Sequence, residues 1–148
     1  MSSAIVIDAS VVVKLFVQED LSDEAHRLFE DLAAREAAQA LDAYAPDFMW
    51  AECANALWKY ARFYGYSVQD AEDNLRDLCH LAITPVPAGQ LLQSDAFRLA
   101  CTYGITFYDS CYVTLAEDLG ARFVTADRKL SQQIGARLPV ILLADWTR

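Results

Sequence analysis

Short apolar runs alternate with longer amphipathic stretches along this chain. Residues 4–8, with the sequence AIVID, form a β-branched apolar run that ends at an acid, which is typical of a buried strand in a parallel sheet. The same reasoning predicts further strands at residues 43–46, 83–87, 122–126 and 139–143.

The segments between these strands have helical periodicity. In residues 21–41 the apolar positions share one helical face with charges opposite, at Ala25, Leu28, Leu32 and Ala33. The other predicted helices are a turn over 10–16, longer helices over 47–64, 67–81, 89–103 and 107–119, and a short helix from Asp127. Because strands and helices alternate, we expect an α/β fold, a sandwich with a mainly parallel central sheet flanked by helices.

The predicted helix over residues 47–64 is unusually rich in apolar residues. One arc of about 100° holds Trp50, Ala54, Leu57, Trp58 and Ala61. Its aromatic residues admit two interpretations, of which we favour core packing; the alternative is a hydrophobic groove for a partner helix. This aromatic set is Phe48, Trp50, Trp58, Tyr60, Phe63 and Tyr64.

Composition adds that the chain is one compact unit. Its 148 residues are 55% hydrophobic and include only 5 Gly and 4 Pro, which excludes disordered and low-complexity proteins and predicts a single domain over residues 1–148. The net charge of −9 argues against a broad basic surface that holds nucleic acid.

The sequence also predicts a cytoplasmic protein. The N-terminal segment lacks a basic start and includes Asp8, and apolar runs stay well short of the ~20 residues of a membrane span, so we expect neither a signal peptide nor a membrane partner. Four cysteines without C-x-x-C spacing predict buried thiols in a reducing compartment: Cys53, Cys79, Cys101 and Cys111.

Four of the 21 acids lie outside the solvated helix faces where acids are usually found. Asp8 ends a predicted strand and Asp127 follows another, while Glu52 and Asp109 lie in apolar helical segments. Ligands of parallel α/β sheets bind outside the carboxyl ends of the strands. We therefore expect Asp8 and Asp127 to share one edge of the sheet.

Each of these acids also has a purely structural interpretation. Asp8 and Asp127 have the position of helix N-caps. Thr106 and Asp109 have capping-box spacing, so Asp109 could serve the start of its helix. However, Asp109 shares a helical face with Tyr112 and other apolar residues, which predicts that its carboxylate points inward.

Glu52 has the weakest geometric case of the four acids. On a helical wheel it lies opposite the predicted apolar stripe and aligns with Asn55 and Lys59, which a solvated polar stripe also explains. Yet four carboxylates at one sheet edge would repel by several kcal/mol at low effective dielectric. A hard cation among them, Mg²⁺ or Mn²⁺, would make the arrangement tolerable.

At these residues the chain resembles the PIN domain family, and more closely its VapC-type toxin ribonucleases of type II toxin–antitoxin systems. The resemblance spans nearly the whole chain and rests on four segments in a fixed order. These are VIDASVVVKL with Asp8, WAECANAL with Glu52, FYDSCYVTLA with Asp109 and FVTADRKL with Asp127.

The resemblance implies a PIN-like α/β/α fold whose acids hold one or two divalent ions that activate water to cut RNA phosphodiester bonds. By motif match the catalytic and metal-binding residues are Asp8, Glu52, Asp109 and Asp127, with Asp8 and Asp109 as direct ligands. Ser10 and Thr125 would support the site by hydrogen bonding. It also implies a homodimer and a VapB-type antitoxin, whose C-terminal segment would occupy the groove on the aromatic helix.

The chemistry of hydrolysis agrees with this interpretation. An activated water needs no histidine as base, and Lys14, Arg128 or Lys129 could meet a phosphate. Three alternatives fit the residues less well. A phosphoaspartyl phosphatase expects D-x-D, where this chain has Ser10; a receiver domain expects an acidic pair on its first strand; and a PIN-like RNA-binding or scaffold module would lack the four acids.

Overall fold

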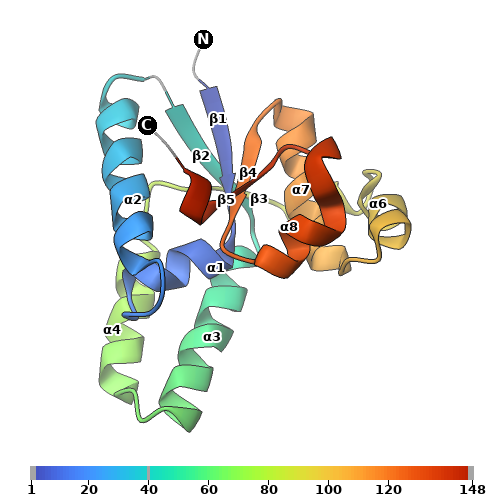
Figure 1. Ribbon diagram of the computed structural model, residues 1–148. Coiled ribbons are helices and arrows are strands. Elements are labelled where there is room, and N and C mark those ends of the chain that lie inside the picture. Colours follow the sequence, from blue (N-terminus) through green and yellow to red (C-terminus); the bar gives the residue numbers. More distant parts are fainter. Residues whose placement is uncertain (1–2, 40, 147–148) are drawn as a thin grey trace.

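A five-stranded parallel sheet forms the centre of the computed structural model, which describes residues 3–39 and 41–146 (Figure 1). The strand order is β3-β2-β1-β4-β5, and every neighbouring pair is parallel. The strands are β1 (Ser3–Ile7), β2 (Leu41–Pro46), β3 (Thr84–Val86), β4 (Arg122–Thr125) and β5 (Val140–Leu142). The predicted α/β/α fold class is confirmed.

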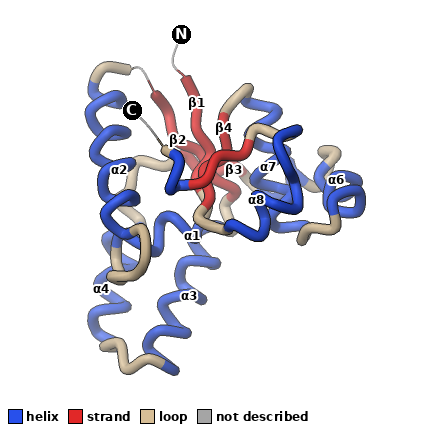
Figure 2. Tube along the Cα trace, in the orientation of Figure 1, coloured by secondary structure: helices blue, strands red, loops and turns tan. Residues whose placement is uncertain are grey.

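Helices cover both faces of this sheet. Figures 1 and 2 show α2 on one side and α6, α7 and α8 on the other, with α3 and α4 extending away from the sheet as a pair. The helices are α1 (Ala9–Val12), α2 (Ser22–Ala37), α3 (Met49–Phe63), α4 (Val68–Leu78), α5 (Ala88–Leu91), α6 (Ala96–Tyr103), α7 (Phe107–Leu119) and α8 (Arg128–Ile134). Short 3-10 turns follow α1, α8 and β5, at Val13–Leu15, Gly135–Arg137 and Leu143–Asp145.

The central strand β1 explains the unbroken apolar run near the start of the sequence. Ile5, Val6 and Ile7 are at most 1% exposed, because helices cover the sheet on both faces and these three side chains do not meet water. Within residues 3–39 and 41–146, none of the helices is long and apolar enough to cross a membrane.

Two predicted helices end differently in the structure. The helix predicted over 21–41 ends at Ala37, and Leu41 already belongs to β2, where it pairs with Ser3; residue 40 lies outside the described residues. Gln39 has a positive φ of 54°, which a continuing helix does not permit. Ala33, predicted on the buried face, is exposed.

The helix predicted over 89–103 is two helices, α5 and α6. The Ser94 hydroxyl donates to the carbonyl of Leu91 and accepts the N–H of Ala96 at 3.2 Å. Such local bonds from a serine side chain compete with the helical ladder and break it here. The predicted end at Gly104 is correct, since this glycine takes the left-handed conformation after α6.

The buried face of α3 differs from the predicted one. Met49, Cys53 and Leu57 are at most 1% exposed, whereas Trp58 is 55% exposed, so the core-facing stripe is rotated by about 90° from the predicted arc and shares only Leu57 with it. Glu52 therefore lies at the edge of the buried stripe and not opposite it.

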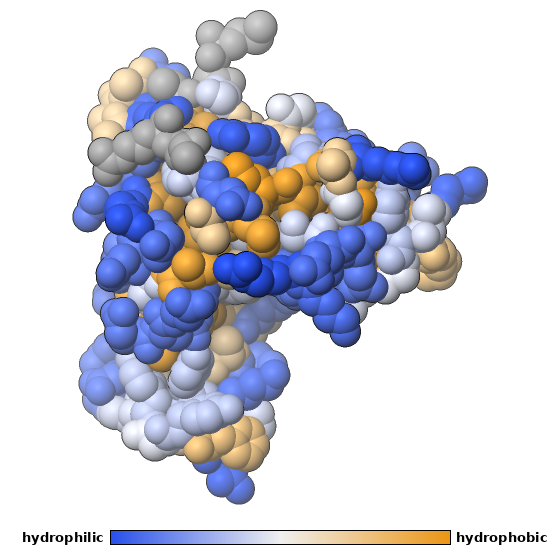
Figure 3. Space-filling view, viewed as in Figure 1, coloured by the Kyte–Doolittle hydropathy of each residue, from blue (hydrophilic) through white to orange (hydrophobic). Residues whose placement is uncertain are grey.

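Core packing is wrong as an explanation for half of the aromatic set. Trp58, Phe63 and Tyr64 are all more than half exposed, and Figure 3 shows hydrophobic surface at the tip of the α3–α4 pair. We call these three residues the aromatic tip. The others in the set, Phe48, Trp50 and Tyr60, pack partly buried against the core.

The cysteines also divide into two groups. All four are free thiols, but only Cys53 and Cys111 are buried, whereas Cys79 and Cys101 are exposed. The prediction of buried thiols is wrong for the latter two, because they lie on the outer faces of the α4 end and of α6.

Candidate acidic active site

The candidate site lies at the carboxyl ends of β1 and β4. Asp8 follows β1 directly, and its N–H donates to the carbonyl of Val124 at 3.0 Å, which extends the pairing of the two strands. Asp127 lies just beyond the end of β4. The strand order reverses between β1 and β4, and such a switch point opens a crevice beyond the strand ends.

One cavity of about 600 Å³ at this point brings the four predicted acids together. Glu52 reaches it from the first turn of α3 and Asp109 from the first turn of α7, while Asp8 and Asp127 come from the sheet edge. Its other polar lining comes from Ser10, Lys14, Glu19, Asn55, Lys59 and Tyr60.

Asp8 is fixed by two hydroxyl groups. Ser10 Oγ and Thr125 Oγ1 each donate to Asp8 Oδ2 at 2.7 Å. Both hydroxyls in turn accept backbone N–H groups, Ser10 from Ala126 and Thr125 from Asp127, each at 3.1 Å. The network therefore ties the end of β1 to the end of β4 and holds Asp8 through Oδ2.

The N-cap interpretation holds for Asp127 but not for Asp8. Asp127 Oδ1 accepts the N–H of Leu130 at 3.0 Å, which caps α8. Asp8 has the N-cap position of α1, but within the described structure its side chain makes no capping bond. Only 7% of Asp8 is exposed, so a carboxylate is buried here for a reason other than helix capping.

The start of α7 is capped by Thr106 and not by Asp109. Thr106 Oγ1 accepts the N–H of Asp109 at 3.1 Å, so the threonine satisfies the helix end. Burial raises the pKa of the Asp109 carboxyl, which the Thr106 hydroxyl lowers and the charge of Asp127 raises further. Asp109 is partly buried and lines the cavity, as its helical face predicted.

Glu52 is held by a residue that the sequence analysis did not assign to the site. The hydroxyl of Tyr112 on α7 donates to Glu52 Oε1 at 2.6 Å. Burial raises the pKa of Glu52 to about 7; the Tyr112 hydroxyl lowers it, and the charges of Asp8 and Asp109 raise it. The sequence held one signal for this pair: Tyr112 was predicted on a buried helical face, and a buried tyrosine hydroxyl needs a hydrogen-bond partner.

The carboxylates repel one another across the cavity. Burial is the main cause that raises the pKa of Asp8; Thr125 and Ser10 lower it, and the charge of Asp109 raises it again. Burial and mutual repulsion make the charged form of these carboxylates unfavourable, and a hard divalent cation, which prefers oxygen ligands, would relieve both. The four acids line the cavity without converging: in the described part of the chain, no three His, Cys, Asp or Glu side chains are grouped closely enough to hold an ion as they stand.

The cavity that holds the acids also contains positive charge, which is partly neutralised. Lys14 Nζ bonds to Glu19 Oε1 at 3.0 Å and to the carbonyl of Asp20 at 2.7 Å, and the Tyr60 hydroxyl donates to the other oxygen of Glu19. Lys59 lines the same cavity. Lys59, Glu19 and Tyr60 were not assigned to the site from sequence, since a polar stripe on a helix is ordinarily a solvated face.

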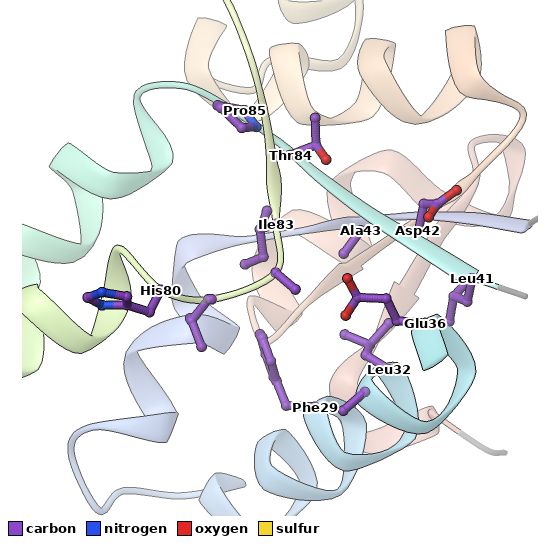
Figure 4. A pocket seen from close by; sticks show the side chains of 13 residues that line it. Phe29, Leu32, Glu36, Leu41, Asp42, Ala43, His80, Ile83, Thr84 and Pro85 are labelled. Atoms are coloured by element: carbon purple, nitrogen blue, oxygen red, sulfur yellow. The ribbon is translucent and has the colours of Figure 1, made fainter. Parts of the chain in front are cut away.

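A second cavity, of about 480 Å³, lies between α2, β2 and the segment that enters β3 (Figure 4). Its lining is mostly apolar, with Phe29 from α2 and Ile83 beside β3, and it includes the acids Glu36 and Asp42. His80 at its margin is exposed and lies just after α4, as expected for a histidine at a helix end. The four predicted acids lie elsewhere, so this cavity is separate from the acidic site.

Comparison with known proteins gives consistent matches over most of the chain. The model of the PIN domain family matches residues 5–134. Ribonuclease VapC3 of Pyrobaculum aerophilum is 34% identical over 134 residues, which cover 89% of this chain and 95% of that protein. The crystal structure of PAE2754 from the same organism matches with a TM-score of 0.67 and 27% identity, over 97% of this chain and 93% of that one. A toxin–antitoxin complex from Klebsiella pneumoniae shares the fold, with a TM-score of 0.65 and 14% identity over 94% and 97% of the two chains.

The raised pKa of Glu52 predicts how the stability of the metal-free protein depends on pH. From the ordinary value of 4.5 up to about 7, the native state holds a proton that the unfolded state has lost, so the free energy of unfolding falls as pH rises through this window. Because Glu52 is partly solvated, we expect a loss of about 1–2 kcal/mol, seen in EDTA as a melting temperature a few degrees lower at pH 8 than at pH 5.

Glu52→Gln should flatten this profile, whereas Glu72→Gln, at an exposed position of α4, should leave it unchanged. Asp8 and Asp109 act in the same direction, so some slope should remain in the Glu52 variant. Equal slopes for the parent and Glu52→Gln would contradict the prediction.

Proposed function

The chain belongs to the PIN domain family, as a VapC-type member, and from this premise we propose that it is a divalent-metal-dependent endoribonuclease, the toxin of a toxin–antitoxin pair. The observation that carries the proposal is the set of four carboxylates around one cavity at the switch point of the sheet. The similarity to a named ribonuclease over most of both chains supports it.

The donor set fits Mg²⁺ or Mn²⁺. Asp8 and Asp109 are the proposed direct ligands, with Glu52 and Asp127 completing the acidic site. When bound there, such an ion supplies an activated water at neutral pH and compensates charge on the phosphorus. The two hydroxyls on Asp8 Oδ2 fix the orientation of this carboxylate at the edge of the cavity.

The basic residues that line this cavity are proposed to position the RNA backbone. Lys14, held by Glu19, and Lys59 place ammonium groups on the same cavity as the acids. On the other side of Asp109 and Asp127, Lys129 lines a neighbouring cavity of about 290 Å³. Local cations of this kind offer phosphate contacts on a chain whose net charge is −9.

The alternative functions fit the geometry less well. In a phosphoaspartyl phosphatase a second acid would stand at position 10, whereas the Ser10 hydroxyl here donates to Asp8 and cannot act as an acid. A scaffold module has no need of Asp8, Glu52 and Asp109 as costly, partly or fully buried carboxylates.

We also propose that the chain is a homodimer and that a VapB-type antitoxin covers the aromatic tip. Trp58, Phe63 and Tyr64 present exposed rings near the end of α3, and Trp58 and Phe63 pack edge to face at 5.8 Å. Exposed apolar surface of this kind is typical of partner sites. Free, exposed thiols at Cys79 and Cys101 support action in a reducing compartment, the cytoplasm.

The purified protein is predicted to cleave single-stranded RNA with Mg²⁺ or Mn²⁺ and to lose cleavage in excess EDTA, because no activated water forms without the ion. Asp8→Asn should lower the cleavage rate by about 100-fold or more. Asp77→Asn, an exposed acid on α4, is the matched control and should cleave like the parent. If a preparation free of contaminating nucleases still cleaves RNA in excess EDTA, the proposed metal dependence is wrong.

Asp109→Asn separates metal binding from a role at the helix start. If Asp109 is one of several crowded carboxylates, the variant melts at an equal or higher temperature in EDTA, gains less from Mn²⁺ than the parent, and no longer cleaves RNA. If the charge only serves the helix dipole, its loss costs about 0.3–1 kcal/mol with and without metal. A uniform drop in melting temperature with cleavage retained would reject the ligand role.

The double variant Trp58→Ser/Phe63→Ser should retain RNA cleavage while losing inhibition by the proposed VapB-type antitoxin. Loss of two central apolar anchors is expected to raise the inhibition constant at least about 30-fold. Leu92→Ser, at an exposed apolar residue away from the aromatic tip, is the control. Full inhibition of the double variant would place the partner elsewhere.

A further inference from the structure

Tyr112 is the one fully buried tyrosine hydroxyl donor that the described residues place next to the acidic site. It lies on α7 one turn after Asp109, it is 0% exposed, and its hydroxyl donates to Glu52 Oε1 at 2.6 Å. The two residues are 60 positions apart in sequence, so this bond connects α7 with α3.

The core holds the Tyr112 ring independently of Glu52. The ring stacks on Phe123 of β4 at 5.2 Å with an interplanar angle of 16°, and Phe48, just before α3, meets it edge to face at 5.7 Å. Packing on two sides leaves the ring little freedom. The position of the hydroxyl is therefore set by the sheet and the helix starts, and the carboxylate adapts to it.

Glu52 needs such a constraint more than the other acids do. Its side chain has three rotatable bonds, and fixing it costs conformational entropy. With Oε1 bonded to Tyr112, Oε2 is left without a hydrogen bond within residues 3–39 and 41–146, and the side chain lines the cavity. Asp8 is likewise held through one oxygen, since both of its hydroxyl partners donate to Oδ2.

We infer that Tyr112 is a positioning residue of the acidic site: its hydroxyl fixes Glu52 so that the remaining carboxylate oxygen is presented to a divalent cation. This inference rests on the proposed function. It adds that α7 serves the site twice, directly through Asp109 and indirectly through Tyr112. A hydroxyl that merely satisfied a buried polar atom would affect stability but not ion affinity.

The test is the Mn²⁺ affinity of Tyr112→Phe, measured by calorimetry in the parent and in a Glu52→Ala background. The variant keeps the stacked ring and loses only the hydroxyl. We expect the dissociation constant to rise about tenfold in the parent, as for other groups that orient a ligand, and not to change in the Glu52→Ala background. The kcat for RNA should fall while KM stays near the parental value.

Two further variants sharpen the measurement. Glu52→Asp keeps the charge but shortens the side chain beyond reach of the hydroxyl, so it should weaken Mn²⁺ binding about as much as Tyr112→Phe. Tyr66→Phe removes a hydroxyl that is also hydrogen-bonded, to Phe16 and Asn74, but lies outside the cavity, and it should bind Mn²⁺ like the parent.

The possible failures are distinguishable. Parental affinity in Tyr112→Phe, or an equal loss in both backgrounds, overturns the positioning role even if Glu52→Ala binds weakly. If Glu52→Ala and Asp109→Asn both bind Mn²⁺ like the parent, the proposed metal site itself fails and the role of Tyr112 fails with it.

Discussion

Everything at this site depends on keeping a buried carboxylate, Asp8, charged and oriented where two strands end. Burial and the charge of Asp109 both favour its neutral form. Two hydroxyl donors, Ser10 and Thr125, stabilise its charged form, and backbone N–H groups just after β4 fix the positions of both hydroxyls. Because the main chain holds these two hydroxyl dipoles in place, they need not reorganise when the Asp8 carboxylate ionises. Dipoles oriented in advance stabilise a charge most effectively.

The strand order supplies the rest of the arrangement. Because β1 lies between β2 and β4, the crevice at its carboxyl end is bordered by elements from both sides of the sheet, α3 from one and α7 from the other. Each helix contributes an acid from its first turn, and neither acid serves as its own helix cap. At the start of α7, Thr106 caps the helix and Asp109 is left to line the cavity. At the start of α8, Asp127 does both.

Sequence reasoning found what is local and missed what depends on tertiary packing. The strand that ends just before Asp8, the α7 N-cap at Thr106 and the four acids could be predicted because strand ends and caps follow from neighbouring residues. Which face of α3 is buried could not be predicted from the sequence. The helix has two neighbouring apolar stripes, one aromatic and one aliphatic, and only tertiary packing decides which of them is buried. The Tyr112–Glu52 pair joins residues 60 positions apart, and a helical wheel shows a face but not the partner across it.

The pairing of β1 with β4 also sets when the site exists during synthesis of the chain. Thr125 donates to Asp8 across 117 positions of sequence, and β4 supplies one wall of the crevice. Contacts of such long range cannot form on a nascent chain until the later segment has left the ribosome, and they close a large loop when they do. A ribosome that has made only the first four-fifths of this protein carries Asp8, Glu52 and Asp109 but no assembled acidic site, so the order of translation itself delays whatever chemistry the site performs.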